Sequence, residues 1–138
     1  MNILFLCTHN AGRSQIAASY CRSIAPHVNV SSAGSNPKPH LNPLAIEAMA
    51  EIGIDICEYK TCQLGDDQIE NADVIISVGC GDGQCIKPSE GKLFLVWDLE
   101  SKSFGNNIEG VRMIRDEITQ KVQQLAVELE LLKEQSAV

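Results

Sequence analysis

Cys7 and Arg13 are the two residues whose types and spacing most clearly suggest chemistry. Five residues separate them in the segment CTHNAGRS, and Ser14 follows Arg13 directly. A cysteine thiolate is a nucleophile, and a guanidinium is a planar, permanently charged fork that matches two oxygens of a tetrahedral anion. The spacing therefore indicates a nucleophile and an anion ligand at the two ends of one short loop.

The loop between these two residues is rich in small and turn-forming residues. Where such a loop enters a helix N-terminus, it can aim several backbone N–H groups into one concavity, and the helix dipole adds positive potential there. We expect it to cradle an oxyanion and to favour the thiolate form of Cys7. The alternative is that Cys7 is a small buried apolar residue at a strand end. The predicted cradle residues are Thr8, His9, Asn10, Ala11, Gly12, Arg13 and Ser14.

Short apolar runs and helical patterns alternate along the chain. The runs span 2–6, 29–33, 73–78 and 92–97, and continuous apolar runs are typical of buried parallel strands. Helical patterns span 13–25, 42–53 and 106–133. In the second pattern Asn42 is the predicted N-cap, Pro43 the first helical residue and Gly53 the stop. The alternation predicts a single α/β domain over residues 1–138, with a parallel sheet covered on both faces. Ligands bind beyond the carboxyl ends of such strands, which is where the loop after Cys7 begins.

Composition narrows the class of protein further. The net charge of −7 disfavours a nucleic-acid partner, because such binding depends on clustered Lys and Arg. The apolar runs are far shorter than the roughly 20 residues that cross a bilayer, and MNILFLC does not resemble a secretory signal. We therefore expect a cytoplasmic protein without a membrane partner, in which the six cysteines are reduced thiols with catalytic, redox or metal-binding roles.

The sequence resembles a known family, the low-molecular-weight protein tyrosine phosphatases and the arsenate reductases that share their fold. The resemblance is carried by ILFLCTHNAGRSQIA, SSAGSNP, LNPLAIEAMAEIGIDI and DVIISVGCGD, in that order. It implies a four-stranded parallel sheet with flanking helices, Cys7 as the nucleophile and Arg13 as the oxyanion ligand. It also implies that the Ser14 hydroxyl hydrogen-bonds the thiolate and that Asn10 braces the backbone of the loop.

The general acid of the phosphatases is missing from its expected place. Phosphatases of the family use an Asp before a Pro, after the last strand, to protonate the leaving group. In VWDLESKSFGN, Ser101 and Lys102 stand at those two positions. Asp98 or Glu100 could act as the acid from a shifted loop, and the alternative is that both are ordinary loop carboxylates.

Cys80 and Cys85 follow the predicted strand at 73–78, so they are expected at the same sheet edge as Cys7. Extra thiols would endanger the nucleophile of a phosphatase, but a reductase requires them. After Cys7 attacks arsenate, a second thiol takes the Cys7 sulfur and arsenite leaves with two electrons. In this relay Cys80 attacks Cys7 and Cys85 resolves the pair, although the sequence leaves open which of them attacks first.

The hypothesis is therefore an arsenate reductase that binds no cofactor and is regenerated by an external thiol reductant. Thioredoxin, glutaredoxin with glutathione, and mycothiol are the candidate reductants; GCGD resembles the arsenate reductases, including the mycothiol-using group. The alternatives are a low-molecular-weight tyrosine phosphatase with a displaced acid, and a redox or oxyanion sensor without turnover. No metal site is predicted, because Cys57 and Cys62 lack the usual zinc spacing and Ala18 replaces the Glu of family members that bind potassium.

Overall fold

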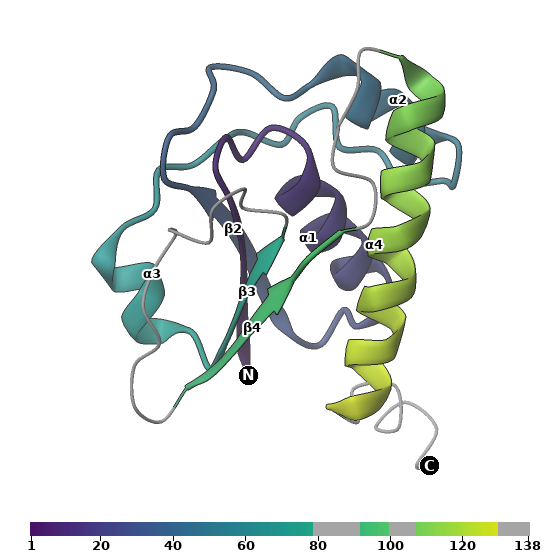
Figure 1. Cartoon of the computed structure of the whole chain (residues 1–138). Helices are drawn as coiled ribbons and strands as arrows, with labels where there is room; N and C mark the ends of the chain where they lie inside the picture. Colours follow the sequence, from purple (N-terminus) through teal and green to yellow (C-terminus); the bar gives the residue numbers. More distant parts are fainter. Residues whose placement is uncertain (79–91, 100–106, 130–138) are drawn as a thin grey trace.

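In the part of the chain that the structure describes, the strands form one four-stranded parallel sheet with the order β2-β1-β3-β4. The structure is a computed structural model, and it describes residues 1–78, 92–99 and 107–129. The strands are β1 (Asn2–Cys7), β2 (Asn29–Gly34), β3 (Val74–Val78) and β4 (Leu93–Trp97). Figure 1 shows all four strands running in the same direction, with their carboxyl ends at the top of the view. The predicted parallel sheet is confirmed.

β1 is a central strand, and its register brings other strand ends next to Cys7. Cys7 is paired with Gly34 at the end of β2, and Leu6 is paired with Ser77 near the end of β3. Because the strands are parallel and in this register, the loops that follow β1 and β2 leave the sheet side by side.

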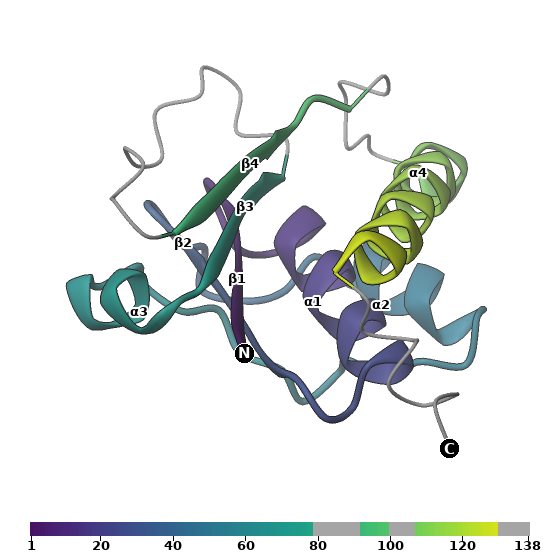
Figure 2. The same ribbon diagram turned by 90° about the horizontal axis from the view of Figure 1, so that it is seen from below.

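Within the described ranges, four helices flank the sheet: α1 (Arg13–Ile24), α2 (Pro43–Ala50), α3 (Asp66–Asn71) and α4 (Ile108–Glu128). Figure 2 shows α1, α2 and α4 on one side of the sheet and α3 on the other. The sequence did not predict α3, which is only six residues long. In the ranges that the structure describes, no helix combines the length and apolar character needed to cross a membrane.

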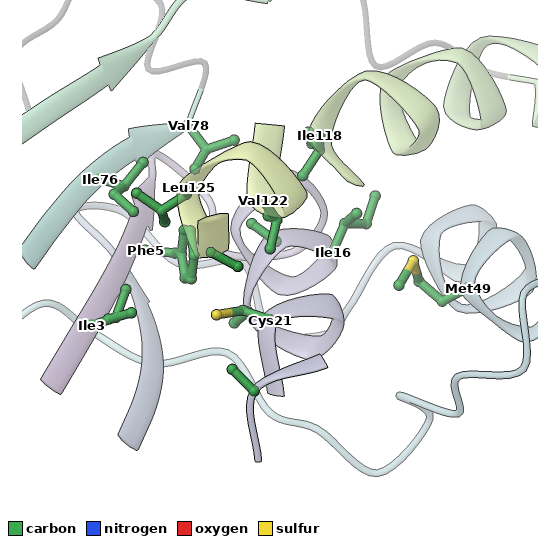
Figure 3. Close-up of a cluster of buried hydrophobic side chains, with 14 of the residues drawn as sticks. Ile3, Phe5, Ile16, Cys21, Met49, Ile76, Val78, Ile118, Val122 and Leu125 are labelled. Carbon is green, nitrogen blue, oxygen red and sulfur yellow. The ribbon is translucent and has the colours of Figure 1, made fainter. Parts of the chain in front are cut away.

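The larger apolar core lies between the sheet and helices α1, α2 and α4 (Figure 3). Ile3 and Phe5 point into this core, whereas Leu4 and Leu6 belong to a smaller cluster on the opposite face. β1 is therefore apolar at consecutive positions because both of its faces are buried. The apolar residues of α4 that recur at intervals of three or four belong to the core, since Val111, Ile114, Ile118, Val122 and Leu125 are all buried.

Helix α2 begins at the predicted residue but ends earlier than predicted. Asn42 is the N-cap, because its side chain accepts a hydrogen bond of 2.9 Å from the N–H of Leu44, and Pro43 is the first helical residue. The helix ends at Ala50, three residues earlier than the prediction. Gly53 instead takes a left-handed conformation with φ of 83° in the turn that follows.

Candidate active site

The loop of residues 8–12 joins β1 to α1 at the carboxyl edge of the sheet (Figure 1). Cys7 is the last residue of β1 and is 4% exposed. Arg13 is the first residue of α1 and is half-buried, and Gly12 is the N-cap. The two residues with the most evident chemistry therefore flank one loop, and the N-terminus of a 12-residue helix lies beside them.

Three carbonyl groups of this loop are turned toward the segment 36–42. Each accepts a hydrogen bond from a backbone N–H there. Of the other two carbonyls of the loop, that of Asn10 accepts a hydrogen bond of 3.0 Å from the side chain of Gln15, and that of Gly12 accepts one of 2.9 Å from the N–H of Ile16 in α1. In a trans peptide the N–H points opposite to the preceding C=O, so outward carbonyls leave the following N–H groups facing inward. The backbone pairs are Thr8 O with Asn36 N (2.8 Å), His9 O with Lys38 N (3.0 Å) and Ala11 O with Asn42 N (2.8 Å).

The inward orientation is directly visible at the sulfur of Cys7. The N–H of Asn10 donates to Cys7 Sγ over 3.2 Å, and Ser14 Oγ lies 2.9 Å from the same sulfur. Hydrogen bonds to the charged form of a group favour that form. Both contacts therefore suit a thiolate nucleophile at the floor of an amide-lined cradle.

Asn10 is the loop residue whose backbone conformation is least common. It is fully buried and has a positive φ of 51°, a conformation that asparagine tolerates better than most residues. Its Nδ2 donates to Ser14 Oγ over 2.7 Å, and its Oδ1 accepts from the N–H of Cys62 over 2.8 Å. Asn10 therefore connects Ser14, which contacts the sulfur of Cys7, to the backbone of Cys62, 52 positions further along the chain.

The segment 62–64 lies against the end of β2 and completes the support of the cradle. Gly34 donates its N–H to the carbonyl of Cys62, and its own carbonyl accepts from Leu64, both over 2.9 Å. A Cβ on Gly34 would lie 2.6 Å from the carbonyl oxygen of Thr8. The absence of a side chain at this position lets β2 approach the loop closely.

The structure brings some of the predicted site residues together and leaves others elsewhere. Residues 7–14 surround one cradle, but Cys80, Cys85 and Glu100 lie outside the described residues. Asp98 is exposed directly after β4. It lines a cavity of about 320 Å³ together with residues of α4, none of which belongs to the cradle. The assignment of Asp98 as a general acid stays a prediction.

The other described cysteines differ in environment. Cys21 is fully buried, and burial raises the pKa of its thiol to about 11, although Arg22 acts in the opposite direction. Cys57 and Cys62 are exposed, and a hydrogen bond with the Asp55 carboxylate raises the pKa of Cys57. Within the described ranges, no three His, Cys, Asp or Glu side chains are grouped so that they could hold a metal ion.

Sequence reasoning did not single out three positions that support the cradle: Gln15, Gly34 and the backbone of Cys62. The available signals were a glutamine directly after Ser14 in a helix that otherwise buries small and apolar residues, and a glycine at the end of an apolar strand. Together, a cysteine at a strand end, inward-facing amides and an arginine at a helix start form an arrangement that can hold an oxyanion beside a thiol.

Comparisons with known proteins show the family of this chain. The profile of the family "Low molecular weight phosphotyrosine protein phosphatase" matches residues 2–137, and the chain belongs to this family. An arsenate reductase of Bacillus licheniformis is 35% identical over 132 residues, which cover 90% of this chain and 94% of that protein. A glutaredoxin arsenate reductase of Synechocystis is 29% identical over 130 residues, which cover 92% and 97%.

Solved structures of both reductases and phosphatases are similar to this chain. The thioredoxin-dependent arsenate reductase of Corynebacterium glutamicum has a TM-score of 0.80 and 37% identity, and the match covers 94% of this chain and 62% of that one. The YwlE arginine phosphatase has a TM-score of 0.79 and 29% identity, with 94% and 96% covered. The fold predicted from the sequence resemblance is confirmed.

Proposed function

We propose that this protein is an enzyme that reduces arsenate to arsenite. The observation that carries the proposal is the sulfur of Cys7, held by the N–H of Asn10 and the hydroxyl of Ser14 on the floor of a cradle with inward-facing amides. Such a site suits a thiolate that attacks a tetrahedral oxyanion. The choice of arsenate is supported by the arsenate reductases among the relatives, which match about nine tenths of this chain.

In the first step the Cys7 thiolate attacks the arsenic atom of arsenate. A sulfur–arsenic bond forms, and an arsenic–oxygen bond breaks to release hydroxide, which takes up a proton as water. The amides of the loop and the guanidinium of Arg13 hold the remaining oxygens and stabilise their charge. Asp98 or Glu100 would supply the proton to the leaving oxygen.

In the second step the thiol of Cys80 loses its proton to solvent and attacks the sulfur of Cys7 as a thiolate. A sulfur–sulfur bond forms, and the sulfur–arsenic pair of electrons leaves with arsenic, which departs as arsenite. Cys80 stands two residues after Val78, the end of β3, and β3 is paired with β1 beside Cys7. Two residues of extended chain span at most about 7 Å, so the sequence separation keeps Cys80 close to the end of β3.

In the third step Cys85 attacks the disulfide and frees Cys7, which leaves a pair between Cys80 and Cys85. An external thiol reductant then restores both thiols. The names of the relatives include thioredoxin-dependent and glutaredoxin enzymes, so both donors are candidates, together with mycothiol. Because every turnover needs reduced thiols, we place the reaction in the reducing cytoplasm.

Phosphate-ester hydrolysis is the second candidate function. The similarity to the YwlE arginine phosphatase favours it, since that protein shares the fold over 94% of this chain. A phosphatase would use the same Cys7 and cradle but would need an acid and water in place of the relay. A sensor that becomes oxidised once, without turnover, is the remaining alternative.

One set of assays separates the three functions. The purified protein is incubated with arsenate or an aryl phosphate, each with thioredoxin, with glutaredoxin and glutathione, with mycothiol, or without reductant. Continuous arsenite formation with one reductant supports the proposal, whereas fast phosphate release without any reductant supports a phosphatase. A single stoichiometric oxidation of Cys7 supports the sensor.

The relay is tested with cysteine variants of the same protein. Cys7→Ser, Cys80→Ser and Cys85→Ser should each abolish multiple turnover, while Cys57→Ser serves as the control because Cys57 is exposed and lies outside the cradle. If Cys80→Ser and Cys85→Ser both leave arsenate-dependent oxidation of the reductant unchanged, the relay is wrong.

A further inference from the structure

Gln15 makes a set of contacts that the reaction described above does not use. It is the third residue of α1 and is 2% exposed. Its Nε2 lies 3.0 Å from the carbonyl oxygen of Asn10, 3.1 Å from Asn10 Oδ1 and 3.2 Å from the carbonyl oxygen of Lys60. An amide nitrogen has two hydrogens, so the three oxygens share two donors. One side chain therefore joins the cradle to the distant segment around residue 60.

These contacts determine how the side-chain amide of Asn10 is oriented. Asn10 Oδ1 accepts from Gln15 and also from the N–H of Cys62, so the oxygen of this amide must face those two donors. The Nδ2 group is thereby directed to Ser14 Oγ, to which it donates over 2.7 Å. An exchanged amide would place its donor hydrogens against two other donors, which is unfavourable in a buried site.

The orientation of Asn10 has a consequence for the proton of Ser14. Because Ser14 Oγ accepts from Asn10, its own hydrogen is available for Cys7 Sγ at 2.9 Å. A thiolate can only accept in this contact, so a donating hydroxyl favours the thiolate over the thiol. A continuous chain of hydrogen bonds thus runs from Gln15 through Asn10 and Ser14 to Cys7.

We propose that Gln15 is a positioning residue that fixes the direction of this hydrogen-bond chain and so keeps Cys7 in its reactive thiolate form before substrate binds. The proposal rests on Cys7 being the nucleophile of the proposed function, but it does not depend on which oxyanion is attacked. Among the described residues, the titratable groups of the loop and of the segments 36–42 and 59–64 packed against it are His9, Arg13, Lys38, His40, Tyr59, Lys60 and Cys62, and all are retained in the variants below.

The test compares Gln15→Glu and Gln15→Met with the wild type. Both variants keep the length of the side chain, but neither offers the two amide hydrogens. The rate of alkylation of Cys7 by iodoacetamide is measured from about pH 4 to about pH 9, with peptide mass spectrometry to separate Cys7 from the other cysteines. We expect the midpoint of the profile to rise by about one pH unit, which is about a tenfold loss of reactivity below the midpoint.

Ser19→Ala is the matched control. Ser19 is also buried on α1, and its hydroxyl donates to the carbonyl of Ile16, away from the cradle. This change should lower the melting temperature modestly and leave the midpoint at the wild-type value. A purely structural role for Gln15 would give the same pattern in Gln15→Met: lower stability with an unchanged midpoint. That result would overturn the proposal.

Gln15→Asn covers the case in which the longer replacements do not fold. It retains both amide hydrogens, but its side chain is one methylene shorter and does not reach the oxygens of Asn10 and Lys60. The midpoint should therefore rise as in the other variants, and an unchanged midpoint would also overturn the proposal. Because alkylation needs neither arsenate nor a reductant, the result is independent of the assays for the proposed function. A protein without arsenate turnover can still show the expected shift.

Discussion

Gly34 and Thr8 lie so close that no side chain fits between them. A Cβ on Gly34 would be 2.6 Å from the carbonyl oxygen of Thr8 and 2.9 Å from that of Cys7. Both are backbone atoms, which cannot rotate away as a flexible side chain can. Gly34, at the end of β2, therefore packs directly against the backbone of the loop that follows β1 and helps to set its shape.

Gly34→Ala should damage both the cradle and the stability of the fold. The added methyl group must displace the loop, and overpacking of this kind costs about 1–3 kcal/mol. We expect weaker binding of inorganic phosphate or arsenate by calorimetry and a lower free energy of unfolding in denaturant. Gly65→Ala is the control, because a Cβ there meets no atom within 4 Å. Unchanged oxyanion affinity in Gly34→Ala would contradict this account of the cradle.

Ser14→Ala should lower the reactivity of Cys7. The change removes the hydroxyl that lies 2.9 Å from Cys7 Sγ, and it leaves Nδ2 of Asn10 without its acceptor. A hydrogen bond to a charged group contributes about 1.5–3 kcal/mol, so alkylation of Cys7 near neutral pH should slow by about 10- to 100-fold. Ser23→Ala, at an exposed serine that bonds to the carbonyl of Tyr20, should leave the rate unchanged. Equal rates in both variants would argue against a role for Ser14.

Glu51 should stabilise the contact between α2 and α4 in a pH-dependent way. Its carboxylate accepts hydrogen bonds from Arg112 and Arg115, and these lower its pKa from 4.5 to about 2. Because the pKa is lower in the folded state, the stabilisation is fully present above about pH 4.5 and is lost as the pH falls toward about 2. Surface ion pairs contribute little and are screened by salt, so the effect should be small and largest at low ionic strength.

The measurement is the difference in melting temperature between the wild type and Glu51→Gln across this pH range. The difference should shrink steadily below pH 4.5. Glu70→Gln, at an exposed glutamate of α3 away from both arginines, is the matched control. A difference for Glu51→Gln that stays constant down to pH 2 would show that the charge of Glu51 does not act through the two arginines.

Cys21 should be inert in the folded protein. It is fully buried in the core beside α4, and its pKa of about 11 leaves it as the thiol near neutral pH (Figure 3). In a labelling experiment resolved by peptide, Cys62 should react within the time that leaves Cys21 unmodified, and Cys21 should react after denaturation. Labelling of Cys21 as fast as that of the exposed Cys62 would show that this part of the core opens readily.

Much of the architecture was predictable, because strands and helices with strong local signals form where the pattern indicates. The four apolar runs became the four strands to within one residue at each end, and the helix at 13–25 was observed at Arg13–Ile24. The helix α3 was missed since it is short and buries no residue completely. The early end of α2 was missed because the glycine signal marks the turn, and not the last helical residue.

The sequence by itself determined that a cysteine and an arginine flank a loop that enters a helix at the carboxyl edge of a parallel sheet. Types, spacing and local order of residues are enough for that inference. Only the tertiary structure decided which carbonyls face away from Cys7, that Gln15 and the backbone of Cys62 orient Asn10, and that residue 34 must be a glycine. These contacts join segments that lie far apart in the chain, and their geometry exists only after the strands have been placed side by side.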